Sequence, residues 1–362
     1  MTTTVPVHLG DRSYEIHIGT GLLARLDELF KPVVRGKKCL VVTDTTVAPL
    51  YAGVCTSALS KLGVTAAQAV IPAGENSKNG EQLFRLYDAA IACGLDRKSF
   101  VVALGGGVVG DLAGYAAASF LRGIQLIQIP TTLLSMVDSA VGGKTGINLP
   151  QGKNLVGAFH QPSLVVCDIE TLKTLPRREL VAGLAEVVKY GVFWDAELFE
   201  LLERNADQIL AGDPALLAKI VARSCEIKAE VVGKDEREEG LRAILNFGHT
   251  MGHAVEAVSG YGHFLHGEAV AIGMVYAARI SENLKSFPVS GTTRLVALLK
   301  KFGLPVGAPE LAWEPLRRAM AVDKKGVAGK LKFVLAGNIG EAEFGCETPE
   351  DLMRQTWESM RG

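Results

Sequence analysis

The chain has 362 residues, of which 48% are hydrophobic, and its 38 lysines and arginines stand against 39 acidic residues for a formal net charge of -1. This length suits two domains, each with a substantial apolar core. The balanced charge argues against a nucleic-acid surface, which needs a clustered excess of cations. The N-terminus has no apolar core of signal-peptide length, and the most apolar helical run, residues 269–278, is about half a bilayer span. We therefore expect no nucleic-acid partner and no membrane segment.

The six cysteines, at positions 39, 55, 93, 167, 225 and 346, are scattered and form no Cys-x-x-Cys pair. This pattern predicts reduced thiols in the core of a cytoplasmic protein, and it indicates no thiolate metal site.

The first half of the chain alternates between apolar strands and helices, after an N-terminal segment that alternates like an edge strand. Strands are predicted at residues 39–44, 67–71 and 100–104, with helices at residues 47–62 and 80–93. The alternation predicts an α/β domain with a mostly parallel sheet. Ligands bind at the carboxyl ends of such strands, so Asp44, Glu75 and Lys78 are candidates for contacts to a ribose.

A glycine motif of the form G-x-G-x-x-G follows the strand predicted at residues 100–104, with glycines at 105, 107 and 110. Glycine permits close backbone approach, and the amides of the helix that follows point at a pyrophosphate. The motif therefore predicts a dinucleotide site. The alternative is a tight turn that only packs helix on strand, because residues 128–130 (QIP) offer no acidic group to hold a ribose.

A second glycine segment, residues 142–146 (GGKTG), is not a P-loop, because Asp138 stands where that motif needs its first glycine. We interpret Lys144 as a cation that a glycine-rich turn directs into a cleft, alongside Asp138, Lys153 and Asn154. These residues predict an anion site.

Helical periodicity dominates after Asp168, which predicts a first domain at residues 1–175 and a mainly helical second domain at residues 176–362. Predicted helices cover residues 180–190, 196–211 and 214–232, and a strand pair is expected near residues 331–335 and 341–344. Glu186 and Lys189 are the ionisable residues on the inner part of an apolar helix. Because a buried charge without a partner is costly, this pair should face a metal, a ligand or each other.

Residues 245–268 contain four of the seven histidines of the chain. If the segment is one helix, Asn246, His249 and His253 line a single face. Two ordinary core histidines would explain such a pair. Because two further histidines, His263 and His266, follow in one loop, the segment instead favours a metal or acid-base site.

Several motifs together resemble the 3-dehydroquinate synthase family of sugar-phosphate cyclases. They are residues 105–123, 130–135, 138–148, 157–162, 245–256 and 266–274. The resemblance implies an N-terminal α/β domain that binds NAD, an all-helical C-terminal domain that binds metal, and an active site in the cleft between them. A small departure is Ala140, where the family more often has serine.

The resemblance also implies a role for individual residues. Zinc (or cobalt) would be held by Glu186, His249 and His266, although spacing alone would nominate His249 and His253. The cofactor would be contacted by Asp44, Glu75, Lys78, Gly105, Gly106, Gly107, Asp111, Thr131, Thr132, Asp138, Lys144 and Lys153. The substrate and its proton transfers would fall to Arg122, Lys144, Asn154, Lys189, Lys228, Glu238, Arg242, Asn246, His253 and Lys324.

The implied reaction converts 3-deoxy-D-arabino-heptulosonate 7-phosphate to 3-dehydroquinate and phosphate in the shikimate pathway. It proceeds by transient oxidation with NAD, phosphate elimination, re-reduction and an aldol closure, in a cytoplasmic homodimer. Three alternatives remain: another NAD- and zinc-dependent sugar-phosphate cyclase, a metal-dependent NAD alcohol dehydrogenase, and a catalytically inactive nucleotide-binding protein.

Overall fold

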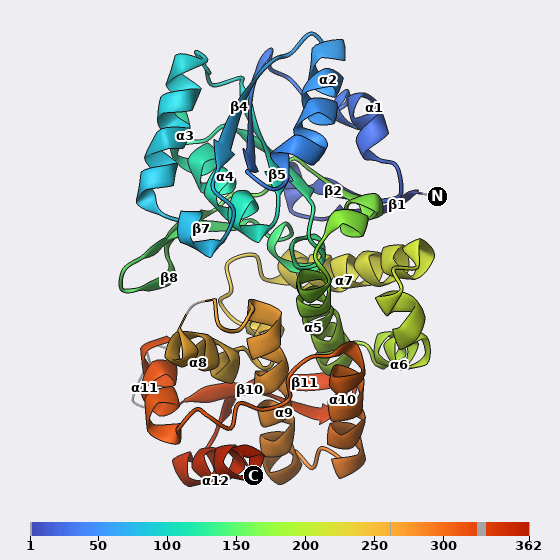
Figure 1. The fold of residues 1–362 in the computed structure, drawn as a ribbon, viewed down its shortest axis with the longest axis vertical. Helices are drawn as coiled ribbons and strands as arrows, with labels where there is room; N and C mark the ends of the chain where they lie inside the picture. The colour runs from blue at the N-terminus through green and yellow to red at the C-terminus, as the bar shows by residue number, and fades with distance from the viewer. Residues whose placement is uncertain (1, 261, 324–330, 362) are drawn as a thin grey trace. The chain divides into compact units, whose positions relative to one another are not determined.

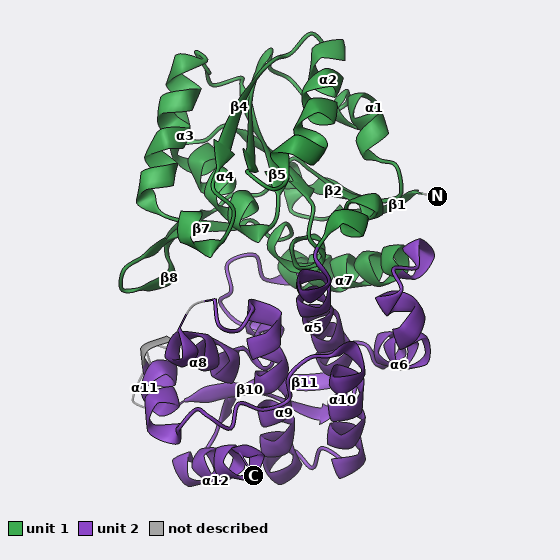
Figure 2. Ribbon diagram, viewed as in Figure 1, with its two compact units in different colours: residues 1–175, 217–233 green, residues 176–216, 234–362 purple. Residues whose placement is uncertain are grey.

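The structure is a computed structural model that describes residues 2–260, 262–323 and 331–361. The chain divides into two compact units, shown in Figure 2: unit 1 contains residues 1–175 and 217–233, and unit 2 contains residues 176–216 and 234–362. The sequence suggested a single boundary after residue 175, whereas in the structure residues 217–233 also group with unit 1. Most of helix α7 (Pro214–Lys234) groups with unit 1, and one of its contacts there is a hydrogen bond of 3.3 Å from Cys225 to the carbonyl of Met136.

Unit 1 is built on a seven-stranded sheet of order β1-β2-β9-β6-β5-β3-β4 (Figure 1). Its strands are β1 (Thr2–Val7), β2 (Tyr14–Gly19), β3 (Lys38–Asp44), β4 (Thr65–Ile71), β5 (Phe100–Gly105), β6 (Gln125–Pro130) and β9 (Leu164–Asp168). Only the pairing of β1 with β2 is antiparallel; the other pairs are parallel, as the alternating sequence pattern predicted. A separate hairpin consists of β7 (Lys144–Leu149) and β8 (Gly152–Phe159).

Helices cover both faces of this sheet. They are α1 (Leu26–Phe30), α2 (Gly53–Lys61), α3 (Gly80–Ala92) and α4 (Gly107–Ser119). Alternate residues of one strand enter different cores: Val41 packs with α1 and α2, whereas Leu40 and Val42 pack with α3 and α4. Because the central strands are buried on both faces, they read as continuous apolar runs in the sequence.

Unit 2 is mainly helical. Its helices besides the ends of α7 are α5 (Arg177–Phe193), α6 (Ala196–Leu210), α8 (His249–Ser259), α9 (His266–Leu284), α10 (Val289–Phe302), α11 (Trp313–Asp323) and α12 (Glu350–Arg361). The predicted strand pair is the hairpin of β10 (Lys332–Asn338) and β11 (Glu341–Glu347), so the unit is not all helical. Within the described residues, no helix is both long enough and apolar enough to cross a bilayer.

Candidate metal and nucleotide sites

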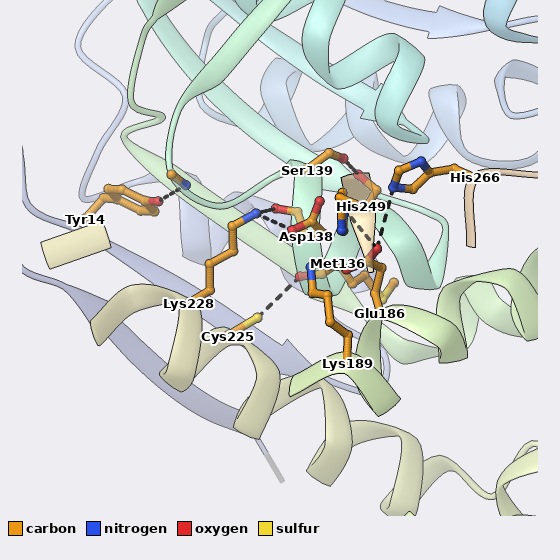
Figure 3. A network of polar contacts seen from close by, with 12 residues as sticks. Tyr14, Met136, Asp138, Ser139, Glu186, Lys189, Cys225, Lys228, His249 and His266 are labelled. Carbon is orange, nitrogen blue, oxygen red and sulfur yellow. Dashed lines mark hydrogen bonds and ion pairs between the residues drawn. The ribbon is translucent and has the colours of Figure 1, made fainter. Parts of the chain in front are cut away.

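Three side chains from three helices of unit 2 converge on one point. Glu186 lies on α5, His249 begins α8 and His266 begins α9. Oε1 of Glu186 is 3.6 Å from Nε2 of His249 and 3.5 Å from Nε2 of His266. Figure 3 shows the two imidazoles directed at the carboxylate, and their ligand atoms lie within 4.8 Å of one another. One carboxylate and two imidazoles form a donor set typical of a catalytic zinc site, which keeps a coordination position open.

Glycines allow these helices to come close enough to build the group. A Cβ at Gly267, beside His266, would lie 1.9 Å from the carbonyl oxygen of Ala182 on α5. A Cβ at Gly273 would lie 1.9 Å from the carbonyl oxygen of Gly248, at the start of α8. Any side chain at either position would push α9 away from its neighbour, because real Cβ atoms do not approach backbone this closely.

The remaining ring nitrogens of both histidines have their own partners. Nδ1 of His249 is 3.2 Å from the carbonyl oxygen of Phe247, and Nδ1 of His266 is 3.1 Å from Oε2 of Glu256. A hydrogen on Nδ1 that is donated to these acceptors leaves the Nε2 lone pair facing Glu186. Metal-binding histidines characteristically have such an arrangement, so the residues present fit a divalent cation.

The electrostatic surroundings of the two histidines differ. Burial lowers the pKa of His249 well below its ordinary value, and the nearby Lys189 ammonium lowers it further. Burial also acts to lower the pKa of His266, but hydrogen bonds to Glu186 and Glu256 outweigh it and raise that pKa to about 10. The two carboxylates beside His266 thus favour its protonated form, whereas burial and Lys189 disfavour that of His249.

Glu186 and Lys189 form an ion pair inside α5, and both side chains are almost fully buried (Figure 3). The sequence predicted that this pair would face a metal, a ligand or each other, and in the structure the two side chains do face each other. The ammonium of Lys189 also lies 5.2 Å from the ring centre of Tyr190.

The prediction that Asn246 shares a helix with His249 and His253 was wrong. Asn246 ends a short 3-10 helix, Leu241–Asn246, and Gly248 with φ of +79° separates it from α8. The carboxamide of Asn246 instead donates a hydrogen bond of 3.0 Å to Glu238. His253 does remain on the helix, with its ring centre 5.3 Å from that of His249.

The loop before this 3-10 helix is held by Asp235, which the sequence analysis did not identify. Its carboxylate accepts hydrogen bonds from the backbone amides of Glu239, Gly240 and Arg242, at 3.0, 2.9 and 2.9 Å. The guanidinium of Arg242 is buried and donates to the carbonyl of Glu236. Asp235 thus fixes the backbone of a loop that carries two of the candidate substrate residues, Glu238 and Arg242.

In unit 1, the candidate cofactor residues gather at the carboxyl ends of the parallel strands. Strand β3 pairs with β4 on one side and with β5 on the other. The chain therefore continues from β3 toward one edge of the sheet with β4 and toward the opposite edge with β5 and β6, so the strand order reverses between β3 and β5. Such a switch point is where open α/β sheets bind ligands. The glycine motif lies there: β5 ends at Gly105 and α4 begins at Gly107. The first amides of α4 have no partner within the helix, so they can bind a phosphate.

The same glycines also serve packing inside unit 1. A Cβ at Gly105 would lie 2.7 Å from the side chain of Val109, one at Gly106 would lie 3.0 Å from Thr132, and one at Gly107 would lie 3.0 Å from Oγ of Ser139. The packing explanation for the motif therefore has support alongside the nucleotide explanation.

Polar side chains beside this motif are already arranged by hydrogen bonds. Lys78 forms an ion pair with Asp111 on α4, and Glu75 accepts a hydrogen bond of 2.8 Å from Asn148. Burial raises the pKa of Asp111, an effect that Lys78 partly offsets. Asp44 accepts hydrogen bonds from the amides of Thr46 and Val47. The buried hydroxyl of Thr131 has no hydrogen-bond partner among the residues that the structure describes.

Lys228 of α7 and Asp138 form an ion pair of 2.6 Å within unit 1 (Figure 3). Lys144 is exposed at the start of β7, directly after two glycines with φ of +94° and +67°. The segment is thus a turn entering a hairpin, and the hairpin also carries the candidates Lys153 and Asn154.

Backbone conformation marks three of the candidate substrate residues. Within the described parts of the chain, the non-glycine residues with positive φ are Leu121, Arg122, Asn154, Glu238 and Ser286. Arg122, Asn154 and Glu238 were all nominated from the sequence. Such conformations are unfavourable and persist where the surroundings enforce them, often at functional sites. The candidate Lys324 lies outside the described residues.

Comparison with known proteins identifies the family. A family model for the N-terminal part of 3-dehydroquinate synthase matches residues 68–182, and one for its C-terminal part matches residues 183–326. A 3-dehydroquinate synthase of Geobacter metallireducens is 54% identical over 337 residues, which are 93% of this chain and 94% of that protein. The chain belongs to the 3-dehydroquinate synthase family.

Solved structures from related enzymes share the fold of this family member. The 2-epi-5-epi-valiolone synthase of Streptomyces hygroscopicus, with NAD and zinc bound, is 31% identical, with a TM-score of 0.89 and 98% of each chain covered. A 2-deoxy-scyllo-inosose synthase complexed with carbaglucose-6-phosphate, NAD and cobalt is 28% identical, with a TM-score of 0.90 and coverage of 99% and 100%. The family resemblance and the α/β-plus-helical fold expected from the sequence are both confirmed.

Proposed function

We propose that this chain is a 3-dehydroquinate synthase, a phosphate-eliminating carbon-oxygen lyase that converts 3-deoxy-D-arabino-heptulosonate 7-phosphate to 3-dehydroquinate. The main support for this proposal is that Nε2 of His249 and Nε2 of His266 both face Glu186, in a chain that belongs to this family. The 54% identity to a named synthase favours this member over the other cyclases, which are 28% and 31% identical.

Glu186, His249 and His266 would hold zinc or cobalt, and the bound ion would act as a Lewis acid toward the hydroxyls of the substrate. The backbone carbonyl of Phe247 accepts a hydrogen bond from Nδ1 of His249, which leaves Nε2 of that ring facing this position. Lys189 offsets the charge of Glu186 within the same helix. The chain thus supplies three donors that face one position.

NAD would serve as a resident hydride acceptor and donor, held at the carboxyl ends of the unit 1 strands. The proposed contacts are Asp44, Glu75, Lys78, the glycines 105–107, Asp111, Thr131, Thr132, Asp138, Lys144 and Lys153. The helix N-terminus at Gly107 favours the pyrophosphate, because partial positive charge and free amides coincide there.

Basic side chains would bind the carboxylate and phosphate groups of the substrate, a requirement that an alcohol dehydrogenase does not have. These side chains are Arg122, Lys144, Lys189, Lys228, Arg242 and Lys324, supported by Asn154, Glu238 and Asn246. His253 would bind the phosphate and carry a proton. Its half-buried ring lies beside the metal donors without being one of them, which suits a group that exchanges protons with the substrate.

The protein would act as a homodimer in the cytoplasm. The six free cysteines, four of them buried, support a reducing compartment. Light scattering on the purified chain would test the dimer.

The function is tested by incubating the purified protein with zinc, a trace of NAD and the heptulosonate phosphate. Phosphate should be released continuously while the nicotinamide absorbance shows no lasting NADH. Glucose 6-phosphate and sedoheptulose 7-phosphate, as matched substrates for other cyclases, should release little phosphate. Accumulation of NADH in step with turnover, or a faster reaction with either control substrate, would overturn the proposal.

A further inference from the structure

We propose that Glu256 is a positioning residue that orients the imidazole of His266 and thereby sets metal affinity. The inference rests on the metal site of the proposed function. Glu256 lies two helical turns after His249 on α8, so it faces the same side as the metal donors. Glu256 is the last residue of the motif at residues 245–256, but neither its spacing nor the family resemblance gave it a role.

The geometry is specific. Oε2 of Glu256 lies 3.1 Å from Nδ1 of His266, and the carboxylate side chain is 5% exposed. A buried carboxylate is costly unless it has a hydrogen-bonding partner, and here that partner is the ring of a metal donor. The contact fixes which nitrogen of His266 carries the hydrogen, and it leaves Nε2 directed toward Glu186.

His266 needs this support more than the other two donors do. Its side chain is 28% exposed, compared with 11% for His249 and 0% for Glu186. It is also the first residue of its helix, whereas Glu186 lies well inside α5. The ring of His249 is held by a backbone carbonyl at its own helix start, but the ring of His266 is held by a side chain from another helix.

The backbone at the start of α9 is secured independently of Glu256. Arg178 on α5 donates two hydrogen bonds of 2.7 Å to Glu268 and one of 2.9 Å to the carbonyl of His263. Glu268 in turn accepts a hydrogen bond of 2.8 Å from the amide of Leu265. Loss of Glu256 should therefore release the imidazole of His266 while α9 stays in place.

A second group of possible donors, formed by His253, Glu256 and His266, would instead make Glu256 a metal ligand. If both groups bound an ion at once, the two ions would have to share His266, one on each ring nitrogen. We favour the positioning role because Nδ1 of His266 contacts Glu256 directly while its Nε2 faces Glu186. The stoichiometry of metal binding separates the two cases.

The test compares Glu256→Gln and Glu256→Ala with wild type by zinc competition against a chromogenic chelator. Glutamine can still accept the hydrogen of Nδ1, so its zinc affinity should fall less than that of the alanine variant, which we expect to lose about 10- to 100-fold. The cobalt absorption spectrum of Glu256→Ala should change, since the ring is no longer held. Glu282→Gln, elsewhere on α9, is the matched control and should bind zinc like wild type.

Several outcomes would overturn the inference. The first is an unchanged zinc affinity in Glu256→Ala. The second is an equal loss of zinc affinity in both variants together with a lower melting temperature of the metal-free protein, which would indicate a merely structural role. The third is binding of two zinc ions per wild-type chain, which would make Glu256 a metal ligand. If Glu256→Ala does not fold, Glu256→Leu takes its place, because leucine fills the same space without a hydrogen-bond acceptor, and unchanged zinc affinity and cobalt spectrum in that variant would overturn the inference. A wild-type chain that binds no zinc would instead contradict the proposed function.

Discussion

Oε1 of Glu186 lies 3.5 Å from Nε2 of His266, although the two residues belong to helices that are far apart in the chain. The approach depends on Gly267, which lets α9 touch the backbone of α5 next to this pair. The donor group is therefore a product of helix packing, and its disruption should be measurable through metal binding.

His266→Ala should lose both zinc and activity, because only two of the three donors remain. Metal analysis after dialysis measures the loss. His263→Ala is the matched control, since His263 is an exposed histidine in the same loop that contacts Phe264 and not the donors. Stoichiometric zinc in His266→Ala would show that the donor assignment is wrong.

Lys189→Met should destabilise the metal-free protein by about 3–5 kcal/mol, because it leaves the carboxylate of Glu186 buried without its cation. Zinc should restore part of this stability by supplying positive charge at the same carboxylate. Urea unfolding with chelator and with zinc measures both effects.

The control for this change is Lys173→Met. Lys173 forms the same i,i+3 pair with Glu170, but the two side chains are 65% and 48% exposed, so solvent screens the pair and its loss should not measurably change stability. Equal losses for the two lysines, or a loss at Lys189 that zinc does not reduce, would contradict the prediction.

Gly107→Val should weaken NAD binding by about 10- to 100-fold, which corresponds to about 1.4–2.8 kcal/mol, because the valine side chain would fill the space against the pyrophosphate. Because a Cβ there would lie 3.0 Å from Oγ of Ser139, part of the cost belongs to packing. The double variant Gly107→Val with Ser139→Ala relieves that contact. Its melting temperature should recover while NAD affinity, measured by calorimetry, stays low. Recovery of NAD affinity as well would favour the packing role alone.

Asp111→Asn should gain stability relative to wild type as the pH rises from about 4 toward neutrality. Burial raises the pKa of Asp111 above its ordinary value of 3.8, despite the opposing effect of Lys78. The folded state therefore binds a proton at Asp111 more tightly than the unfolded chain does. The contribution of the Asp111 carboxyl to the free energy of unfolding is present at low pH and is lost as the pH rises through the folded-state pKa. Asparagine does not titrate. Urea unfolding across this range should show a growing difference, whereas a constant difference would contradict the prediction.

Much of unit 1 could be predicted from the sequence, because its central strands are buried on both faces and read as apolar runs. Strand β5, its glycine turn and α4 follow from local residue types. The hairpin of β7 and β8 was not predicted, because the GGKTG segment signals a turn but not the strand partner that follows. The grouping of residues 217–233 with unit 1 was not predicted either. It involves contacts between residues far apart in the chain, such as Cys225 and Met136, and the local sequence of a helix does not reveal such contacts.

The cluster of histidines at residues 245–268 was enough to favour a metal or acid-base site there. Spacing alone nominated His249 and His253, because helical periodicity reports only on neighbours within one helix. The family resemblance named Glu186, His249 and His266, but the short distances among these three side chains, and between Glu256 and His266, arise in the folded chain. The physical reason is that these distances depend on how three helices pack against one another at glycines, a property of the folded chain that no single segment contains.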